Sequence, residues 1–432
     1  MVYAALSKSS KLSYFLVDKG DNIVQTYTDN MTSNIASDPV SGNTQKDTDP
    51  MSVNNNYDFD TIVDRHNTHS SKWDKYKHQD IIPLWVADTD FKVAPVVQRA
   101  IEERARHGVF GYTSTDKERD QVVANYYQKK YGLHVEADWI VWVPGIVASL
   151  TLAIGSLSKQ HQQVLTPDIV YPYLHTTPAA VGKQANHLAM TYAEDRVRID
   201  LDALEKRNAK DARVMLFCNP QNPGGAIYTD KELSRIDSYC EVNDLILVSD
   251  EIHADIILDD NKQHLPYFGT SDYALNNSIT LGAASKAFNV AGLACSWAII
   301  ANEDIRQAFK HEMHGIISEI NPFGYVATLT ALREGDEWLC AMNQYLRTNR
   351  DYLLEQINAI EGLRMLPLES TFLAWIDVSA LNLKDPCGFF EAAGVGLSPG
   401  SNFNDNNFLR LNFGCAKSVL EEAVSRIKKA LV

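Results

Sequence analysis

The chain has 432 residues, of which 45% are hydrophobic and 22% charged, a composition that suits a folded protein large enough for two domains. Its 55 acidic and 40 basic side chains give a net charge of −15, which argues against nucleic acid or an anionic membrane as the main partner. No apolar run has the length of a membrane span, and the N-terminus lacks the pattern of a secretory signal. We therefore expect a cytoplasmic protein with neither a nucleic acid nor a membrane as partner.

The first 56 residues differ in composition from the rest. Asn, Asp, Ser and Thr dominate residues 28–56, where apolar side chains are too sparse to build a core. We expect residues 1–56 to form a disordered N-terminal extension. Met51 leaves a second interpretation open, in which these residues are upstream sequence included by an early start codon.

Short apolar runs alternate with helical patterns from Tyr57 onward. The predicted elements, in chain order, are a helix over 95–108, a strand over 140–143, a helix over 145–157, a strand over 214–218, a helix over 229–240 opened by a capping box, and strands over 245–248 and 279–281. This alternation is typical of a parallel sheet covered by helices. Strands at 372–376 and 408–412 and a helix over 420–431 then predict a smaller α+β domain.

Two strand ends carry backbone features that suit ligand binding, since ligands of open α/β sheets bind at the carboxyl ends of strands. After the strand at 140–143, the N–H groups of Ile146 and Val147 lie at a helix start and can hold a phosphate, although many helices begin this way. After the strand at 214–218, a turn over 219–225 rich in Pro and Gly fixes the direction of Asn222.

Two further strand ends carry ionisable side chains. Asp250 follows the strand at 245–248, where its carboxylate can pair with a protonated ring nitrogen or simply cap a loop. His253 and Asp255 lie close by, but no second His stands at ligand spacing and the six cysteines are scattered, so we expect no metal site. Lys286 follows the strand at 279–281 among small and apolar residues, an unusual setting for a side chain that is normally solvated.

Several motifs together resemble fold-type I enzymes that use pyridoxal 5′-phosphate (PLP). These motifs are VYPYLH (170–175), NPQNPGG (219–225), SDEIH (249–253), SKAFNVAGL (285–293) and FLRLNFG (408–414). Others resemble the MalY/PatB-type cystathionine β-lyases, namely VDRHNTHSSKWDKY (63–76), LWVADTDF (84–91), HGVFGYT (107–113) and STFLAWID (370–377). The resemblance covers residue 57 to the C-terminus. It implies an α/β fold with a mostly parallel seven-stranded sheet in a large PLP-binding domain over 105–335, and a smaller α+β domain built from 57–104 and 336–432.

The resemblance implies a cofactor role for individual residues. Lys286 would carry PLP as a Schiff base and move the Cα proton, while Asp250 would keep the ring nitrogen protonated. The 3′ oxygen would be bound by Asn222 and His253, and Tyr171, chosen over Tyr173, would stack on the ring.

Phosphate and substrate contacts follow from the same resemblance. The phosphate would be bound by Ile146, Val147 and Ser285, and by Tyr112 of the partner subunit, which implies a homodimer. Arg410 would bind the carboxylate of an amino-acid substrate, and Asp88 would line the entrance together with Tyr112.

Two positions depart from patterns of related enzymes. Ala283 stands where the family usually has a hydroxyl side chain, which removes one phosphate contact. Ala294 stands where many aminotransferases have an arginine, which favours a lyase.

The sequence therefore predicts β-elimination of L-cystathionine and related cysteine S-conjugates to a thiol, which is homocysteine for cystathionine, with pyruvate and ammonia. A class I/II aminotransferase that passes the amino group to a 2-oxo acid stays open, since the same cofactor and lysine serve both reactions. A second, regulatory role in protein binding also stays open.

Overall fold

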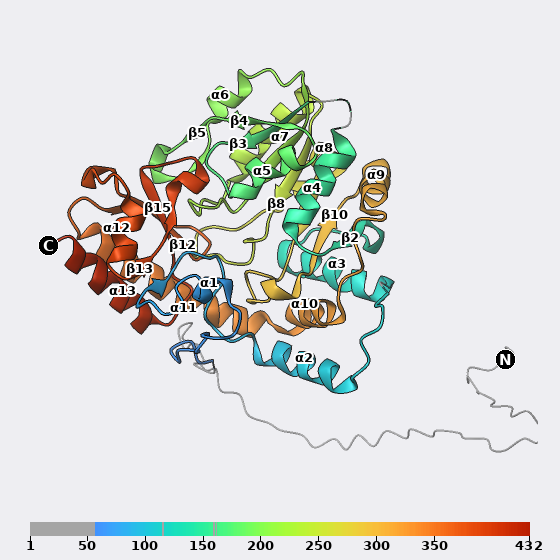
Figure 1. Cartoon of the computed structure of the whole chain (residues 1–432). Helices are drawn as coiled ribbons and strands as arrows, with labels where there is room; N and C mark the ends of the chain where they lie inside the picture. Colours follow the sequence, from blue (N-terminus) through green and yellow to red (C-terminus); the bar gives the residue numbers. More distant parts are fainter. Residues whose placement is uncertain (1–56, 115, 159, 161) are drawn as a thin grey trace, which may run out of the picture. The chain divides into compact units, whose positions relative to one another are not determined.

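The computed structural model describes residues 57–432 apart from 115, 159 and 161 (Figure 1). The extension expected over residues 1–56 lies outside the described residues. None of the helices described is both long and apolar enough to cross a membrane.

A seven-stranded sheet runs through the middle of the chain in the order β2-β10-β9-β8-β7-β3-β4. Its strands are β2 (Ile140–Val143), β3 (Gln163–Pro167), β4 (Gln184–Leu188), β7 (Ala212–Cys218), β8 (Ile246–Asp250), β9 (Ser278–Gly282) and β10 (Ser296–Ile299). The strands from β9 to β4 pair in parallel, whereas β10 is antiparallel to both of its neighbours. The mostly parallel α/β sheet predicted from the sequence is confirmed.

The central strands are apolar throughout because helices cover both faces of the sheet. Along β7, Leu216 packs in one apolar cluster with Leu150 of α4 (Ile146–Leu157). Its neighbour Phe217 points to the opposite face and packs in a second cluster with Leu233 of α7 (Asp230–Val242). Successive side chains on a strand alternate between faces, so an apolar layer on each side requires a continuous apolar run.

Helices of varied length surround this sheet (Figure 1). Besides α4 and α7, they are α3 (Lys117–Tyr131), α5 (Pro172–Ala180), α6 (Leu201–Glu205), α8 (Asp272–Asn276), α9 (Glu303–Met313) and α10 (Pro322–Glu334). The capping box predicted for α7 is present: the Glu232 backbone N–H donates to the Thr229 side chain, and the Thr229 N–H donates to the Glu232 carboxylate at 2.8 Å. A short ribbon of β5 (Met190–Thr191) and β6 (Arg198–Ile199) lies beyond β4 in the chain.

A second, antiparallel sheet forms from the C-terminal hundred residues in the order β11-β12-β15-β14. Its strands are β11 (Arg364–Met365), β12 (Leu373–Asp377), β14 (Ser398–Pro399) and β15 (Phe408–Asn412). The helices α11 (Asp336–Asn358) and α13 (Lys417–Ala430) contribute to the same apolar cluster, for example through Leu353 and Val424. This part also contains α12 (Pro386–Ala392) and β13 (Val395–Gly396).

The N-terminal described segment joins this second sheet region. Its elements are α1 (Ser71–Asp74), β1 (Ile82–Pro83) and α2 (Pro95–His107), and β1 pairs in parallel with β13. The smaller α+β part that the sequence indicates is therefore present. The domain limits 57–104, 105–335 and 336–432 stay predictions.

Candidate active site

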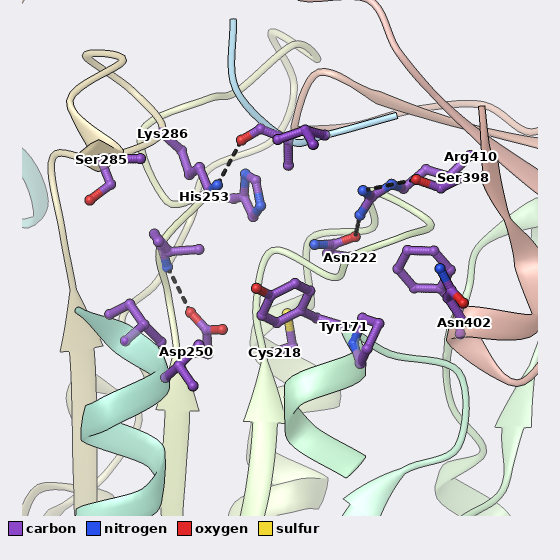
Figure 2. A pocket seen from close by; sticks show the side chains of 18 of the residues that line it. Tyr171, Cys218, Asn222, Asp250, His253, Ser285, Lys286, Ser398, Asn402 and Arg410 are labelled. Atoms are coloured by element: carbon purple, nitrogen blue, oxygen red, sulfur yellow. Dashed lines mark hydrogen bonds between the residues drawn. The ribbon is translucent and has the colours of Figure 1, made fainter. Parts of the chain in front are cut away.

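A cavity of about 450 Å³ lies at the carboxyl ends of the central parallel strands, a volume typical of small-molecule sites. Cys218 and Asp250, the last residues of β7 and β8, reach its wall. The lining residues are Trp85, Val86, Ala87, Gly145, Ile146, Val147, Tyr171, Pro172, Cys218, Asn222, Asp250, Ile252, His253, Ser285, Lys286, Ala291, Ser398, Asn402, Phe403 and Arg410. In Figure 2, Lys286 and Asp250 lie at one side of this space and Arg410 at the other.

The cavity brings together every residue that the sequence suggested for cofactor contact except Tyr112. Tyr112 lies on the connection between α2 and α3 and its side chain is fully exposed. Asp88 is also absent from the wall, and its carboxylate Oδ2 pairs with Arg65 Nη2 at 2.9 Å. Of the two candidate stacking tyrosines, Tyr171 lines the cavity, whereas Tyr173 lies outside the wall and is 47% exposed.

Lys286 is a partly buried lysine shortly after β9. Its Nζ donates a hydrogen bond to the carbonyl oxygen of Ala87 at 2.6 Å (Figure 2). Burial lowers the pKa of Lys286 to about 8, although the Asp88 carboxylate acts in the opposite direction. A lysine with such a pKa is partly unprotonated near neutral pH, so its amine can serve as a nucleophile or a base.

Asp250 is a buried carboxylate with no cationic side chain within ion-pair distance among the described residues. One of its oxygens accepts a hydrogen bond from the Ile252 N–H at 3.2 Å. Burial raises the pKa of Asp250 to about 6, against the attraction of the nearby Lys286. Since an uncompensated buried carboxylate is costly, this position fits a ligand that brings a protonated nitrogen.

His253 is a buried imidazole in the cavity wall. Neither of its ring nitrogens has a hydrogen-bond partner within the described part of the chain, although the residue is only 1% exposed. Burial lowers the pKa of His253 well below its usual value, so the ring is neutral. Because buried polar groups are almost always paired, this orphaned imidazole indicates a ligand with a polar atom beside it.

The start of α4 forms another part of the wall. Gly145 precedes this helix with φ 111°, a conformation that favours glycine, and its N–H donates to the Ser296 hydroxyl at 3.0 Å. The first N–H groups of a helix have no partner inside the helix, and here those of Ile146 and Val147 belong to residues of the cavity wall. Such a helix end binds anions, and Ser285 adds a hydroxyl to the same wall.

Arg410 is held by β15 on the opposite side of the cavity. Its Nη1 donates to Asn222 Oδ1 at 3.0 Å (Figure 2), and its Nη2 donates to the Trp85 carbonyl oxygen at 3.0 Å. The ring of Phe403 packs against the guanidinium at 4.6 Å. Burial lowers the pKa of Arg410 to about 10, which leaves it charged near neutral pH. Its Nε is buried without a partner in the described residues, so the group can still bind a carboxylate.

Some wall residues were not predicted from the sequence. Trp85, Val86 and Ala87 belong to the motif over 84–91. The carbonyl oxygens of Trp85 and Ala87 bind Arg410 and Lys286, and a backbone contact of this kind cannot be predicted from the type of side chain. Asn402 and Phe403 follow the Pro399–Gly400 turn, and no motif in the sequence indicates them as wall residues.

The fold and this cavity define an α/β enzyme with a partly buried lysine, an aspartate and an arginine around a small-molecule site. The family model described as aminotransferase class I and II matches residues 79–427, and the chain belongs to this family.

Known proteins similar to the chain cover most of its length. Cystathionine beta-lyase PatB from Bacillus subtilis (strain 168) is 32% identical over 86% of this chain and 99% of that protein. Among solved structures, OvoB is 39% identical with a TM-score of 0.84, covering 87% of this chain and 99% of OvoB. The PLP-bound C-S lyase from Staphylococcus hominis is 30% identical with a TM-score of 0.80, covering 88% of this chain and 99% of that lyase.

Proposed function

We propose that this chain is a PLP-dependent carbon–sulfur β-lyase that converts L-cystathionine and related cysteine S-conjugates to a thiol, pyruvate and ammonia. The observation that carries the proposal is the placement of Lys286, Asp250 and Arg410 around one buried cavity. The similarity to PatB and to the Staphylococcus hominis lyase supports β-elimination as the reaction within the family.

The cavity offers complementary groups for each part of PLP. When bound, PLP supplies an electron sink for the charge left at the substrate Cα. Asp250 would keep a proton on the ring nitrogen, and burial, which raises the pKa of its carboxyl group to about 6, makes a cationic partner favourable there. The side chains that would bind the 3′ oxygen and the ring face are Asn222, His253 and Tyr171, and those that would bind the phosphate are Ser285 and the start of α4.

The remaining groups would act on the amino-acid substrate. Arg410 would bind its carboxylate through the donors that the protein leaves free. Lys286, whose pKa burial lowers to about 8, would take the proton from Cα and return protons later in the cycle. Asp88 lies behind Ala87 and would influence Lys286 through its charge rather than by touching the substrate.

A homodimer completes the proposal. Val109 and Phe110 are 64% and 53% exposed and lie beside the fully exposed Tyr112, an apolar surface of the kind that forms interfaces. In such a dimer, Tyr112 of the partner subunit would contact the phosphate. The six free cysteines are consistent with a reducing cytoplasm, where we propose that the protein acts.

The test is the release of pyruvate from L-cystathionine by the purified protein without any 2-oxo acid acceptor. Pyruvate can be followed by coupling to lactate dehydrogenase, with Lys286→Ala as the inactive control. Amino-group transfer to 2-oxoglutarate with no pyruvate release would contradict the lyase proposal and identify an aminotransferase.

A further inference from the structure

The segment over residues 85–88 presents its backbone carbonyl groups alternately to two sides. On the cavity side, the Trp85 oxygen accepts from Arg410 Nη2 at 3.0 Å and the Ala87 oxygen accepts from Lys286 Nζ at 2.6 Å. Carbonyl groups two residues apart in an extended segment point the same way. One short stretch of backbone therefore binds both cations of the site.

Both intervening carbonyl groups accept from Asn412, and the Asp88 oxygen also accepts from Lys72 Nζ at 3.2 Å. Asn412 Nδ2 donates to the oxygens of Val86 and Asp88, the latter at 2.6 Å, and its Oδ1 accepts from the Gly414 N–H at 2.7 Å. Asn412 is 1% exposed and lies two residues after Arg410 on β15, so both side chains leave the same face of that strand.

We propose that Asn412 is a positioning residue, which holds the 85–88 segment in the register that aims the Trp85 and Ala87 carbonyl groups at Arg410 and Lys286. It touches neither cation itself. Through these two carbonyl groups, one amide sets the place of the group that binds the substrate carboxylate and of the group that moves the Cα proton. The roles of Arg410 and Lys286 in this statement rest on the proposed function.

Other contacts fix the two ends of this stretch, since the Ser398 hydroxyl donates to the Trp85 oxygen at 2.8 Å, and they leave its middle to Asn412. Asn289 Nδ2 binds the carbonyl groups of Thr89 and Phe91. Lys72 Nζ binds the Asp90 carboxylate at 2.8 Å and the Asp88 carbonyl oxygen at 3.2 Å, so the two side chains fix the chain from residue 88 onward. The Val86 carbonyl has its donor only in Asn412 among the described contacts. Loss of the amide would leave the Val86 carbonyl without its donor and remove one of the two donors of the Asp88 carbonyl, while the contacts of Trp85 and Asp88 with Ser398 and Lys72 stay.

The chain supplies a matched control in Asn349 of α11. This residue is also fully buried, and its Nδ2 also donates to two backbone carbonyl groups, those of Phe413 at 3.0 Å and Cys415 at 2.9 Å. Neither of these carbonyl groups contacts a side chain of the cavity. Asn349→Ala therefore removes two amide-to-carbonyl hydrogen bonds, as Asn412→Ala does, without touching the 85–88 segment; Asn412→Ala removes in addition the bond that Oδ1 accepts from the Gly414 N–H.

The decisive readout is the chemical reactivity of Lys286 in the full-length protein after removal of cofactor. Limited labelling of amines at a series of pH values, read by mass spectrometry of the peptide that contains Lys286, gives the pKa of this amine. A carbonyl acceptor stabilises the ammonium form, so Asn412→Ala should shift that pKa downward by about one unit. Asn349→Ala should leave it at the wild-type value.

A second readout uses the cofactor-loaded protein. Because Arg410 loses a fixed anchor, the KM for L-cystathionine should rise about tenfold in Asn412→Ala and stay unchanged in Asn349→Ala. The labelling result needs no turnover, so it stands even if L-cystathionine proves not to be a substrate. Failure of the proposed function and failure of this inference are thereby distinguished.

An unchanged labelling pKa of Lys286 in a folded Asn412→Ala protein would overturn the inference and leave Asn412 a purely structural residue. If that variant does not fold, Asn412→Ser is measured in its place. Its hydroxyl donates a single hydrogen bond, so it can hold one carbonyl group but not both. A downward shift smaller than one unit supports the inference, and no shift overturns it.

Discussion

Asp250 and His253 lie three residues apart, and burial moves their pKa values in opposite directions. The pKa of Asp250 rises to about 6 and the pKa of His253 falls well below its usual value. Both shifts have the same origin, because burial disfavours the charged form of either group. The site therefore contains a buried carboxyl group without a cationic partner and a buried neutral imidazole without a hydrogen-bond partner among the described residues. A bound ligand can supply both partners.

Replacing Asp250 by Asn should separate activity from stability. The isosteric amide cannot keep a ring nitrogen protonated, so pyruvate release should fall by about a hundredfold or more. The folded protein, in contrast, loses an unpaired buried carboxylate and should not become less stable. Pyruvate assays and thermal unfolding of the same preparations measure both effects, and a parallel loss of activity and stability would argue that Asp250 is structural.

The stability difference should depend on pH in a defined direction. The pKa of Asp250 is raised from 3.8 to about 6 on folding, so the folded state binds more protons between these values and this group makes stability fall as pH rises through that window. Without cofactor, Asp250→Asn should therefore unfold at a higher temperature than wild type above pH 6. The difference should disappear near pH 4, and a constant difference over this range would contradict the assignment.

At the scale of elements, strand ends and helix starts bring the site together. β7, β8 and β9 end at the cavity because parallel strands share one carboxyl edge, and α4 directs its free N–H groups to the same edge. The sharp entry into α4 at Gly145 is needed for this direction, since φ 111° is strained for any residue with a Cβ.

Gly145→Ala should weaken binding of the PLP phosphate group at the start of α4. Space is not the problem, because nothing lies within 4 Å of a Cβ built there. Backbone strain of about 1–3 kcal/mol would instead turn the first N–H groups of α4 away. The Kd for PLP should rise, whereas the Kd for pyridoxal, which has no phosphate, should change little. Gly132→Ala, also at positive φ in open space but at the end of α3, is the control. Equal weakening of both ligands by Gly145→Ala would contradict a phosphate role for this helix start.

The elements also show which parts of the fold the sequence can predict. Strands buried on both faces leave continuous apolar runs, so the strand ends before Asn222, Asp250 and Lys286 were predicted within two residues of their observed positions. β4, with the sequence QANHL, lies at the sheet edge and is mostly accessible, so it lacks such a run. Boundaries also moved where capping was weak: α13 begins at Lys417 rather than at residue 420.

At the scale of the whole molecule, the site depends on contacts that no local pattern encodes. Lys286 binds a carbonyl group 199 residues earlier in the chain, and Arg410 binds an amide 188 residues earlier. The motifs predicted which residue types gather at the cavity. They did not predict that backbone carbonyl groups of residues 85–88 hold the two cations, because that depends on how the N-terminal segment pairs with β13 and β15.

If each site is shared between the two subunits of the proposed dimer, two defective variants should restore activity when they are mixed. Sites that lie within single subunits would not show this effect. If Tyr112 of the partner subunit completes each site, the Lys286→Ala protein should be inactive alone and the Tyr112→Ala protein only weakly active. In a mixed dimer, one site would carry both changes and the other neither. Subunits exchanged at random should therefore regain about one quarter of wild-type activity, since half of the dimers are mixed and half of their sites are intact. Pyruvate release after co-refolding measures this gain. Activity no greater than the average of the two separate variants would mean that Tyr112 serves its own subunit or neither.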